Sequence, residues 1–339
     1  MVPFAGWQMP VQYEGIMPEH KNVRSALGVF DISHMGQFSV TGPSACEWLD
    51  NLLTNNVESL SVGEGQYTFL LNDTGGVIDD LIIYRQEESK YFLVVNASKI
   101  DEDFEWMSEH GGSDSAIEFQ DLSVDYAGMA IQGPNSVQAF ESLIPGATLP
   151  ERFCMAEFSV GNERVIICRT GYTGEDGYEL FCSAASGPAW WAKCLAAGAK
   201  PTGLGARDSL RLEKCYPLNG NDLSPEVTPL QAGMGFAVDL NKANFIGKSR
   251  LVQQKADGLP KRLVAIRQTE KSPPPRPGYE VYSADQLVGT LSSGGVSPIL
   301  GCGISLAYIE AGHNRIGTSL DVEIRGKRFP ATVVKKPFV

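Results

Sequence analysis

Two adjacent acids, Asp79 and Asp80, lie within a stretch that otherwise has the pattern of a buried strand. In the segment from Val77 to Arg85, Asp80 shares a face with Tyr84, whereas Asp79 belongs to the opposite face. Both faces are apolar apart from the acids, so we expect the strand to be covered on both sides. A buried carboxylate is costly unless something hydrogen-bonds to it. Backbone N–H groups near the preceding turn explain the acids as well as a ligand does.

A third candidate acid, Glu179, follows the glycine-rich turn from Gly171 to Gly177. Glu179 and Phe181 share one face of the predicted strand. A carboxylate beside an aromatic ring can accept two parallel N–H bonds from a flat heterocycle, with the geometry that it uses toward guanidinium. A cross-strand salt bridge is the commoner role for a glutamate in a hairpin, and the sequence by itself favours it.

Arg207, Arg211 and Lys214 are spaced i, i+4 and i+7 on a predicted helix. Like charges at this spacing repel one another. The pattern therefore indicates that they face an anionic ligand or protein acids, and acids of the same segment explain it equally well. His34 lies in a predicted turn and has no evident nucleophile partner, so a structural role is favoured for it.

The composition excludes several function classes. The chain has 339 residues, 43% of them hydrophobic, and a net charge of −12, which argues against nucleic acid as a partner. No P-loop or dinucleotide fingerprint is present. The four histidines have no metal-site spacing, so we expect no metal. No apolar run is long enough to span a membrane. The seven cysteines form no C-x-x-C pair, which predicts reduced thiols in a cytoplasmic protein.

The elements that must position these residues change in type along the chain. Residues 1–255 interleave predicted strands with helices, which is typical of an α+β fold. Residues 256–339 contain only short strand-like pieces separated by glycine- and proline-rich turns, which predicts a small antiparallel barrel or sandwich. The predicted helices are Glu19–Ala26, Ser44–Leu53, Ser98–His110 with Ser98 as its N-cap, Asn135–Leu143, Gly187–Ala197 and Ala206–Lys214.

Six segments together closely resemble the T-protein family of the glycine cleavage system, which comprises tetrahydrofolate-dependent aminomethyltransferases. They are Met1-Val-Pro-Phe-Ala-Gly-Trp7, Val29-Phe-Asp-Ile-Ser-His-Met-Gly36, Gly75-Gly-Val-Ile-Asp-Asp-Leu81, Arg169-Thr-Gly-Tyr-Thr-Gly-Glu-Asp-Gly177, Gly203-Leu-Gly-Ala-Arg-Asp-Ser-Leu-Arg-Leu-Glu213 and Asn244-Phe-Ile-Gly-Lys248. The resemblance covers nearly the whole chain. It implies two intertwined α+β folate-binding lobes and a C-terminal antiparallel β-barrel, in a three-lobed arrangement around a central channel.

The resemblance also implies a reaction and a set of site residues. The lipoylated H-protein presents an aminomethyl group, and its one-carbon unit passes to the co-substrate tetrahydrofolate with release of ammonia. By motif, Asp80 is the catalytic carboxylate, Glu179 holds the pterin edge and Arg207 supports the folate site. The residues that match pocket-lining positions are Met35, Tyr67, Tyr84, Asn96, Tyr172 and Tyr216.

Two departures from the family pattern leave alternatives open. Family members usually carry a short segment before the first motif, and without it we expect docking of H-protein to suffer. The segment from Glu213 to Gly220 partly resembles a signature of folate-binding iron–sulfur assembly factors, but it lacks the glycine before Cys215. The alternatives are such a non-catalytic factor, or a tetrahydrofolate-dependent demethylase of another small methyl donor.

Overall fold

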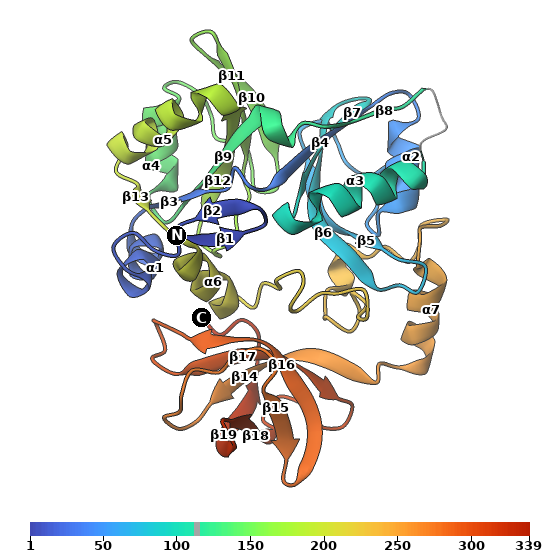
Figure 1. Cartoon of the computed structure of the whole chain (residues 1–339). Coiled ribbons are helices and arrows are strands. Elements are labelled where there is room, and N and C mark those ends of the chain that lie inside the picture. Colours follow the sequence, from blue (N-terminus) through green and yellow to red (C-terminus); the bar gives the residue numbers. More distant parts are fainter. Residues whose placement is uncertain (112–115) are drawn as a thin grey trace. The chain divides into compact units, whose positions relative to one another are not determined.

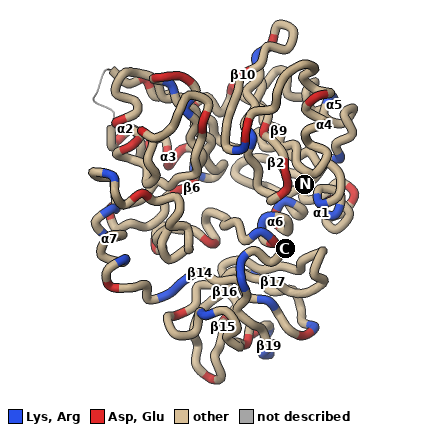
Figure 2. Tube along the Cα trace, turned by 180° about the vertical axis from the view of Figure 1, so that it is seen from behind, with Lys and Arg blue, Asp and Glu red and all other residues tan. Residues whose placement is uncertain are grey.

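The computed structural model describes residues 1–111 and 116–339, which divide into two compact units. The first unit comprises residues 1–71, 78–207 and 237–246, and the second comprises residues 72–77, 208–236 and 247–339. The division of the sequence at residue 255 stays a prediction. Figure 2 shows acidic and basic residues interspersed along the chain.

The first unit is built on two mixed-length sheets, in which neighbouring strands are mostly antiparallel (Figure 1). The six-stranded sheet has the order β10 (Met155–Val160), β11 (Glu163–Cys168), β12 (Gly177–Ser183), β9 (Tyr126–Gln132), β3 (Gly28–Asp31), β13 (Lys200–Pro201). The five-stranded sheet has the order β5 (Gly65–Leu71), β6 (Val77–Glu87), β7 (Lys90–Val95), β4 (Gly36–Thr41), β8 (Glu118–Asp121). The chain leaves the first sheet after β3 and returns to it at β9, which confirms the intertwined α+β arrangement.

Helices cover one face of each sheet. Every one of these helices has an apolar stripe at helical spacing, and it packs that stripe against the sheet. Helix α2 (Ala45–Leu52) contributes Trp48 and Leu49, and α3 (Ile100–Glu109) contributes Met107, to the core of the five-stranded sheet. Helix α4 (Ser136–Leu143) contributes Phe140, and α5 (Gly187–Ala196) contributes Trp190, to the core of the six-stranded sheet. Helix α1 (Ile16–Ser25) is the first helix along the chain and precedes β3.

The faces of the two sheets that lack helices meet through aromatic side chains. Phe92 of β7 contacts Phe181 of β12 with 5.6 Å between ring centroids, and Tyr126 of β9 with 5.9 Å. On β6, Leu81 and Ile83 belong to the helix-side core. On its other face Tyr84 is fully buried, while Asp80 and Ile82 are half-buried, so the cover that the sequence predicted on both sides is complete only on the helix side.

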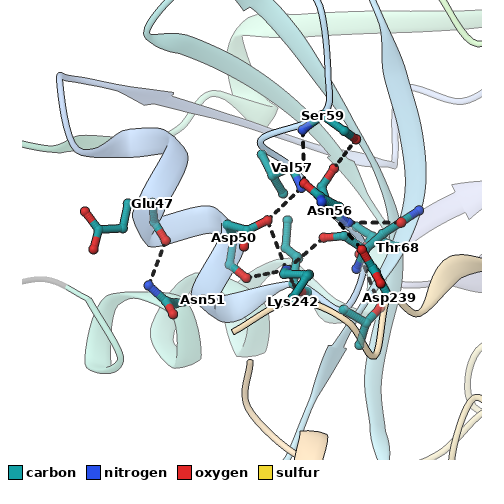
Figure 3. Close-up of polar contacts among 12 residues, drawn as sticks. Glu47, Asp50, Asn51, Asn56, Val57, Ser59, Thr68, Asp239 and Lys242 are labelled. Carbon is teal, nitrogen blue, oxygen red and sulfur yellow. Dashed lines mark hydrogen bonds and ion pairs between the residues drawn. The ribbon is translucent and has the colours of Figure 1, made fainter. Parts of the chain in front are cut away.

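A buried lysine fastens residues 237–246 to the end of α2 (Figure 3). The ammonium of Lys242 donates to the carbonyl oxygens of Leu53 at 2.7 Å and Asn55 at 2.9 Å, and pairs with the Asp50 carboxylate at 3.1 Å. Several acceptors offset much of the cost of burying this charge. The segment is thereby held in the first unit although it follows far later in the sequence.

The second unit contains a closed barrel of six antiparallel strands in the order β14 (Lys261–Gln268), β17 (Gly303–Glu310), β16 (Gln286–Val296), β15 (Glu280–Ser283), β18 (Ser319–Ile324), β19 (Lys327–Val334). Alternate residues such as Val281, Ile309 and Val322 fill its core. The structure thus selects the barrel over the sandwich. Helix α6 (Leu204–Glu213) and helix α7 (Lys248–Asp257) precede the barrel in sequence.

Some predicted boundaries and caps were wrong. Helix α1 begins at Ile16 rather than Glu19, because the buried Glu19 carboxylate accepts hydrogen bonds from three backbone N–H groups just before the helix. Ser98 is not an N-cap, since it lies in a 3₁₀ turn (Ala97–Lys99) that precedes α3. The strands and the helix that sequence analysis missed are β1 (Val2–Phe4), β2 (Trp7–Met9), β8, β10, β13 and α7.

Candidate active site

The Asp80 carboxylate is half-buried and hydrogen-bonded at both oxygens. The Tyr67 hydroxyl, from β5, donates to Asp80 Oδ2 at 2.7 Å. The Asn96 side-chain amide, at the end of β7, donates to Asp80 Oδ1 at 3.1 Å and to the Asp80 carbonyl oxygen at 2.9 Å. Two predicted site residues therefore converge on the predicted catalytic acid, and both act as uncharged donors.

The neighbouring acid, Asp79, is fully buried on the helix side of β6. It accepts hydrogen bonds from the Asn96 backbone N–H at 3.1 Å and from the Asn96 amide at 2.8 Å. Burial raises the pKa of Asp79, and these hydrogen bonds oppose the increase. For Asp79 the fold supplies a backbone donor, which was one of the two interpretations open from the sequence.

Glu179 is the end of a chain of three hydrogen-bonded groups. The Thr170 hydroxyl donates to Glu179 Oε2 at 2.7 Å, and the Tyr84 hydroxyl lies 2.8 Å from Thr170 Oγ1. Because an ionised carboxylate only accepts, Thr170 must donate to it, and Tyr84 therefore donates to Thr170. Burial raises the pKa of Glu179, while the Thr170 bond and the Arg207 charge oppose that increase. Its bonded partner is a hydroxyl, not the cation of a cross-strand pair.

Arg207 lies over an aromatic ring and beside a neutral imidazole. Its guanidinium carbon is 4.8 Å from the centroid of the Tyr172 ring, a cation–π distance. His34 is 2% exposed, and its burial, together with the Arg207 charge, lowers its pKa to about 3. Its Nδ1 atom has no hydrogen-bond partner among the described residues. Arg207 and Glu179 also interact electrostatically, which links this group to the preceding one.

The structure groups most, but not all, of the predicted site residues. Tyr67 and Asn96 contact Asp80, Tyr84 is linked to Glu179, and Tyr172 contacts Arg207. Met35 is half-buried next to His34, where its carbonyl accepts a hydrogen bond from the Gln37 side chain at 2.8 Å. Tyr216 is half-buried in the second unit.

Sequence reasoning missed two residues of this network. Thr170 lies within the motif that contains the glycine-rich turn, so the motif marked its neighbourhood but not its bond to Glu179. Asp103, on α3, is fully buried, and its side chain interacts with that of Asp79. No pattern in the sequence connects these two acids, because they lie on different elements.

This arrangement suits chemistry in which positive charge develops on a flat substrate. A carboxylate fixed by neutral donors keeps its charge and can stabilise a cation or orient an amine. The second carboxylate, Glu179, can accept hydrogen bonds from a heterocycle, and nearby aromatic groups offer apolar walls. No helix among residues 1–111 and 116–339 is long and apolar enough to cross a membrane.

Comparisons with known proteins point in the same direction. Residues 1–242 match the family described as the GCVT N-terminal domain, and residues 261–339 match the glycine cleavage T-protein C-terminal barrel domain. The chain is 44% identical over 345 residues to an aminomethyltransferase of Geobacillus thermodenitrificans, covering 99% of this chain and 93% of that protein. It is 43% identical over 345 residues to an aminomethyltransferase of Bacillus subtilis, covering 99% and 94%.

A solved structure also matches the whole chain. The crystal structure of glycine cleavage system aminomethyltransferase T from Bartonella henselae has a TM-score of 0.93 and 31% identity, covering 100% of this chain and 93% of that one. The family matches, the full-length relatives and the fold agree with one another. The chain belongs to the glycine cleavage T-protein family and is an aminomethyltransferase.

Proposed function

We propose that this aminomethyltransferase takes the aminomethyl group carried by the lipoyl arm of H-protein and transfers its one-carbon unit to tetrahydrofolate. Ammonia leaves, the carbon becomes bonded to two folate nitrogens as 5,10-methylenetetrahydrofolate, and the lipoyl arm is left as the dithiol. A cytoplasmic location belongs to this proposal and is supported by cysteines that are all free.

The observation that carries the proposal is the Asp80 carboxylate, half-buried and fixed by Tyr67 and Asn96. The attacking folate nitrogen must lose a proton while positive charge develops on the carbon being transferred. A fixed anion beside that nitrogen can orient it and stabilise the charge as it forms. Because the hydroxyl and the amide are already in place, little reorganisation is needed when the reaction occurs.

The other residues of the site are assigned to folate binding. Glu179 offers Oε1 to the N–H groups of the pterin edge while Thr170 occupies Oε2. Arg207, with Tyr172 beneath it, supplies positive charge near Glu179 and opposes the rise in its pKa, so that it can bind as an anion. The proposed lining within the first unit consists of Met35, Tyr67, Tyr84, Asn96 and Tyr172, and the assignment of Tyr216, in the second unit, rests on the motif match alone.

A direct assay tests the proposal. The purified protein is mixed with aminomethylated H-protein and tetrahydrofolate, and methylenetetrahydrofolate and ammonia are measured. We expect both products in equal amounts, with little turnover in the Asp80→Asn variant. Turnover with a free N-methyl or sulfonium compound instead would favour the demethylase alternative, and folate binding without turnover of any donor would favour the assembly-factor alternative.

A further inference from the structure

Two buried acids that interact with each other, Asp79 and Asp103, lie next to the proposed catalytic acid and have no role in the reaction described above. Asp103 is fully buried, and neither of its carboxyl oxygens accepts a hydrogen bond from an N–H or O–H of the other described residues. Its side chain instead interacts with that of Asp79, an interaction that lowers the pKa of Asp79 and raises the pKa of Asp103. Two carboxyl groups can bond to each other only if one of them carries a proton.

The surroundings decide which of the two acids holds that proton. Asp79 accepts two hydrogen bonds from Asn96, and both favour its ionised form. Asp103 has no such donor, although its place in the first turn of α3 would favour a charge. Burial, and then the Asp79 charge, raise the pKa of Asp103 to about 11, against the weaker pull of the Lys99 ammonium. That ammonium is itself paired with Glu102 at 2.7 Å.

Ionised Asp79 in turn fixes the orientation of the Asn96 amide. The Nδ2 atom of Asn96 has three acceptors, which are Asp79 Oδ1, Asp80 Oδ1 and the Asp80 carbonyl oxygen. None of these atoms can donate to an amide oxygen while the acids are ionised, so the amide cannot be rotated to exchange its nitrogen and oxygen. If Asp79 gained a proton, this constraint on the amide would weaken, and the hydrogen bonds from Asn96 to Asp80 would weaken with it.

We propose that protonated Asp103 is a positioning residue for Asp80: it donates a hydrogen bond to Asp79, keeps Asp79 ionised, and thereby makes Asn96 hold the Asp80 carboxylate. Asp103 does not touch the substrate. Its effect on turnover rests on the proposed function, whereas its protonation does not.

Two substitutions at position 103 test whether Asp103 acts as a neutral hydrogen-bond donor or only fills space. Asp103→Asn keeps an N–H donor for Asp79 without a charge, and we expect kcat within about threefold of the parent protein, a difference below 1 kcal/mol. Asp103→Leu removes the donor, and we expect kcat to fall about tenfold, which corresponds to about 1.4 kcal/mol. The KM for tetrahydrofolate should change much less. Asp101→Asn, at an exposed position on the same helix, is the matched control.

The pH profile distinguishes positioning from a general loss of structure. Without the Asp103 proton, Asp79 loses a donor and its pKa rises further, so the acidic limb of the kcat profile should move to higher pH in Asp103→Leu. It should stay in place in Asp103→Asn and in the control. Equal damage from Asn and Leu in folded protein, or an unchanged kcat and acidic limb in both, would overturn the proposal.

A measurement without substrate covers the case in which Asp103→Leu fails to fold. In protein labelled with ¹³C at aspartate carboxyl carbons, one carboxyl should remain protonated at about pH 7, far above the ordinary range for aspartate. Its signal should vanish in Asp103→Asn. The absence of any protonated aspartate in the parent protein would refute the proposal, whether or not H-protein and folate are turned over. Conversely, an inactive protein with that signal would contradict only the proposed function.

Discussion

The two units stabilise their buried carboxylates differently: the second unit uses a cation, and the first uses uncharged hydrogen-bond donors. In the second unit, Asp222 is fully buried and accepts hydrogen bonds from the Arg211 guanidinium at 2.8 Å, from Ser292 at 2.6 Å and from Ser293 at 2.7 Å. In the first unit, Asp79 faces another acid, and Asp80 is held by a hydroxyl and an amide. One acid is neutralised by a cation, while the others are not.

This difference separates a structural cluster from a functional one. A buried acid with a bonded cation has its charge compensated before any ligand arrives, so it contributes to the stability of the folded state. An anion held by neutral donors keeps a negative potential that a developing positive charge can use. We therefore expect substitutions at the Arg211–Asp222 pair to affect stability, and substitutions around Asp80 to affect turnover.

The largest effect should come from Asp80→Asn. This change preserves the shape of the side chain but removes the charge, and we expect kcat to fall by roughly 100- to 10,000-fold, the usual span for a positioned acid–base group. Folate affinity should change far less, because the charge matters most as the cation forms. Steady-state kinetics and calorimetric titration measure both quantities. Glu87→Gln, at an exposed position on the same strand, should behave as the parent protein, and a fully active Asp80→Asn variant would refute the assignment.

Arg211→Met should have the largest effect on stability. It leaves Asp222 buried without its cation, and we expect the free energy of unfolding to fall by about 3–5 kcal/mol. Chemical denaturation provides the measurement. The exposed pair of Arg328 and Asp285 supplies the control, because Arg328→Met should barely move the midpoint. Equal midpoints for the two variants would show that the buried pair is not the structural cluster described here.

Glu179→Gln should weaken folate binding while leaving the fold intact. One carboxylate oxygen is replaced by a donor, which cannot accept an N–H of the pterin edge. We expect a loss of roughly 1.5–3 kcal/mol, the range for hydrogen bonds to charged groups. Calorimetric titration with tetrahydrofolate that gave the parent affinity would remove Glu179 from the binding site.

Thr170→Val should have a smaller, pH-dependent effect on the same titration. The hydroxyl that donates to Glu179 is lost, so the pKa of Glu179, already raised by burial, should rise further. Folate affinity should fall by about 0.5–1.5 kcal/mol. The affinity should also begin to decline at a higher pH than in the parent protein as the solution is acidified. A pH dependence identical to that of the parent protein would argue against the hydroxyl relay.

Asp103→Asn should increase stability at neutral and alkaline pH. The pKa of Asp103 rises from the ordinary 3.8 to about 11 on folding, so between these values the folded state holds a proton that the unfolded state has released. The parent protein is therefore expected to lose stability as the pH rises through that window, and asparagine has no such dependence. Thermal unfolding should show an advantage of the variant at pH 8 that shrinks toward about pH 4. An advantage that grew on acidification would mean that Asp103 is ionised in the folded protein.

The sequence predicted the strands and the barrel well because they depend on local alternation of apolar and polar residues. Residues 256–339 form the antiparallel barrel that their short strand-like pieces indicated, and Asp79 and Asp80 lie on opposite faces of β6 as its pattern indicated. Helix α7 was missed because Leu251 and Gln254 are its only buried residues, too few to form an apolar stripe. Local pattern thus fixes elements where one face is buried, and fails where an element is mostly exposed.

The contacts within the candidate site were harder to predict from the sequence than the strands were. Motifs marked Asp80, Glu179 and Arg207, whose roles stay predictions. The partners that tune these groups come from other elements: Thr170 bonds to Glu179 across a turn, and Asp103 reaches Asp79 from a helix. Such pairs follow from tertiary packing, and no spacing along one strand or helix encodes them.

The insertion of the five-stranded sheet between β3 and β9 has a consequence for synthesis on the ribosome. Strand β3 pairs with β9, yet residues 32–125 must be translated between them. At 5–20 residues per second this delay is roughly 5–20 s. During that interval the apolar residues Val29 and Phe30, fully covered in the finished protein, have no sheet to join. The nascent chain therefore exposes an unpaired apolar strand, which is prone to aggregate and which a chaperone can cover until β9 is synthesised.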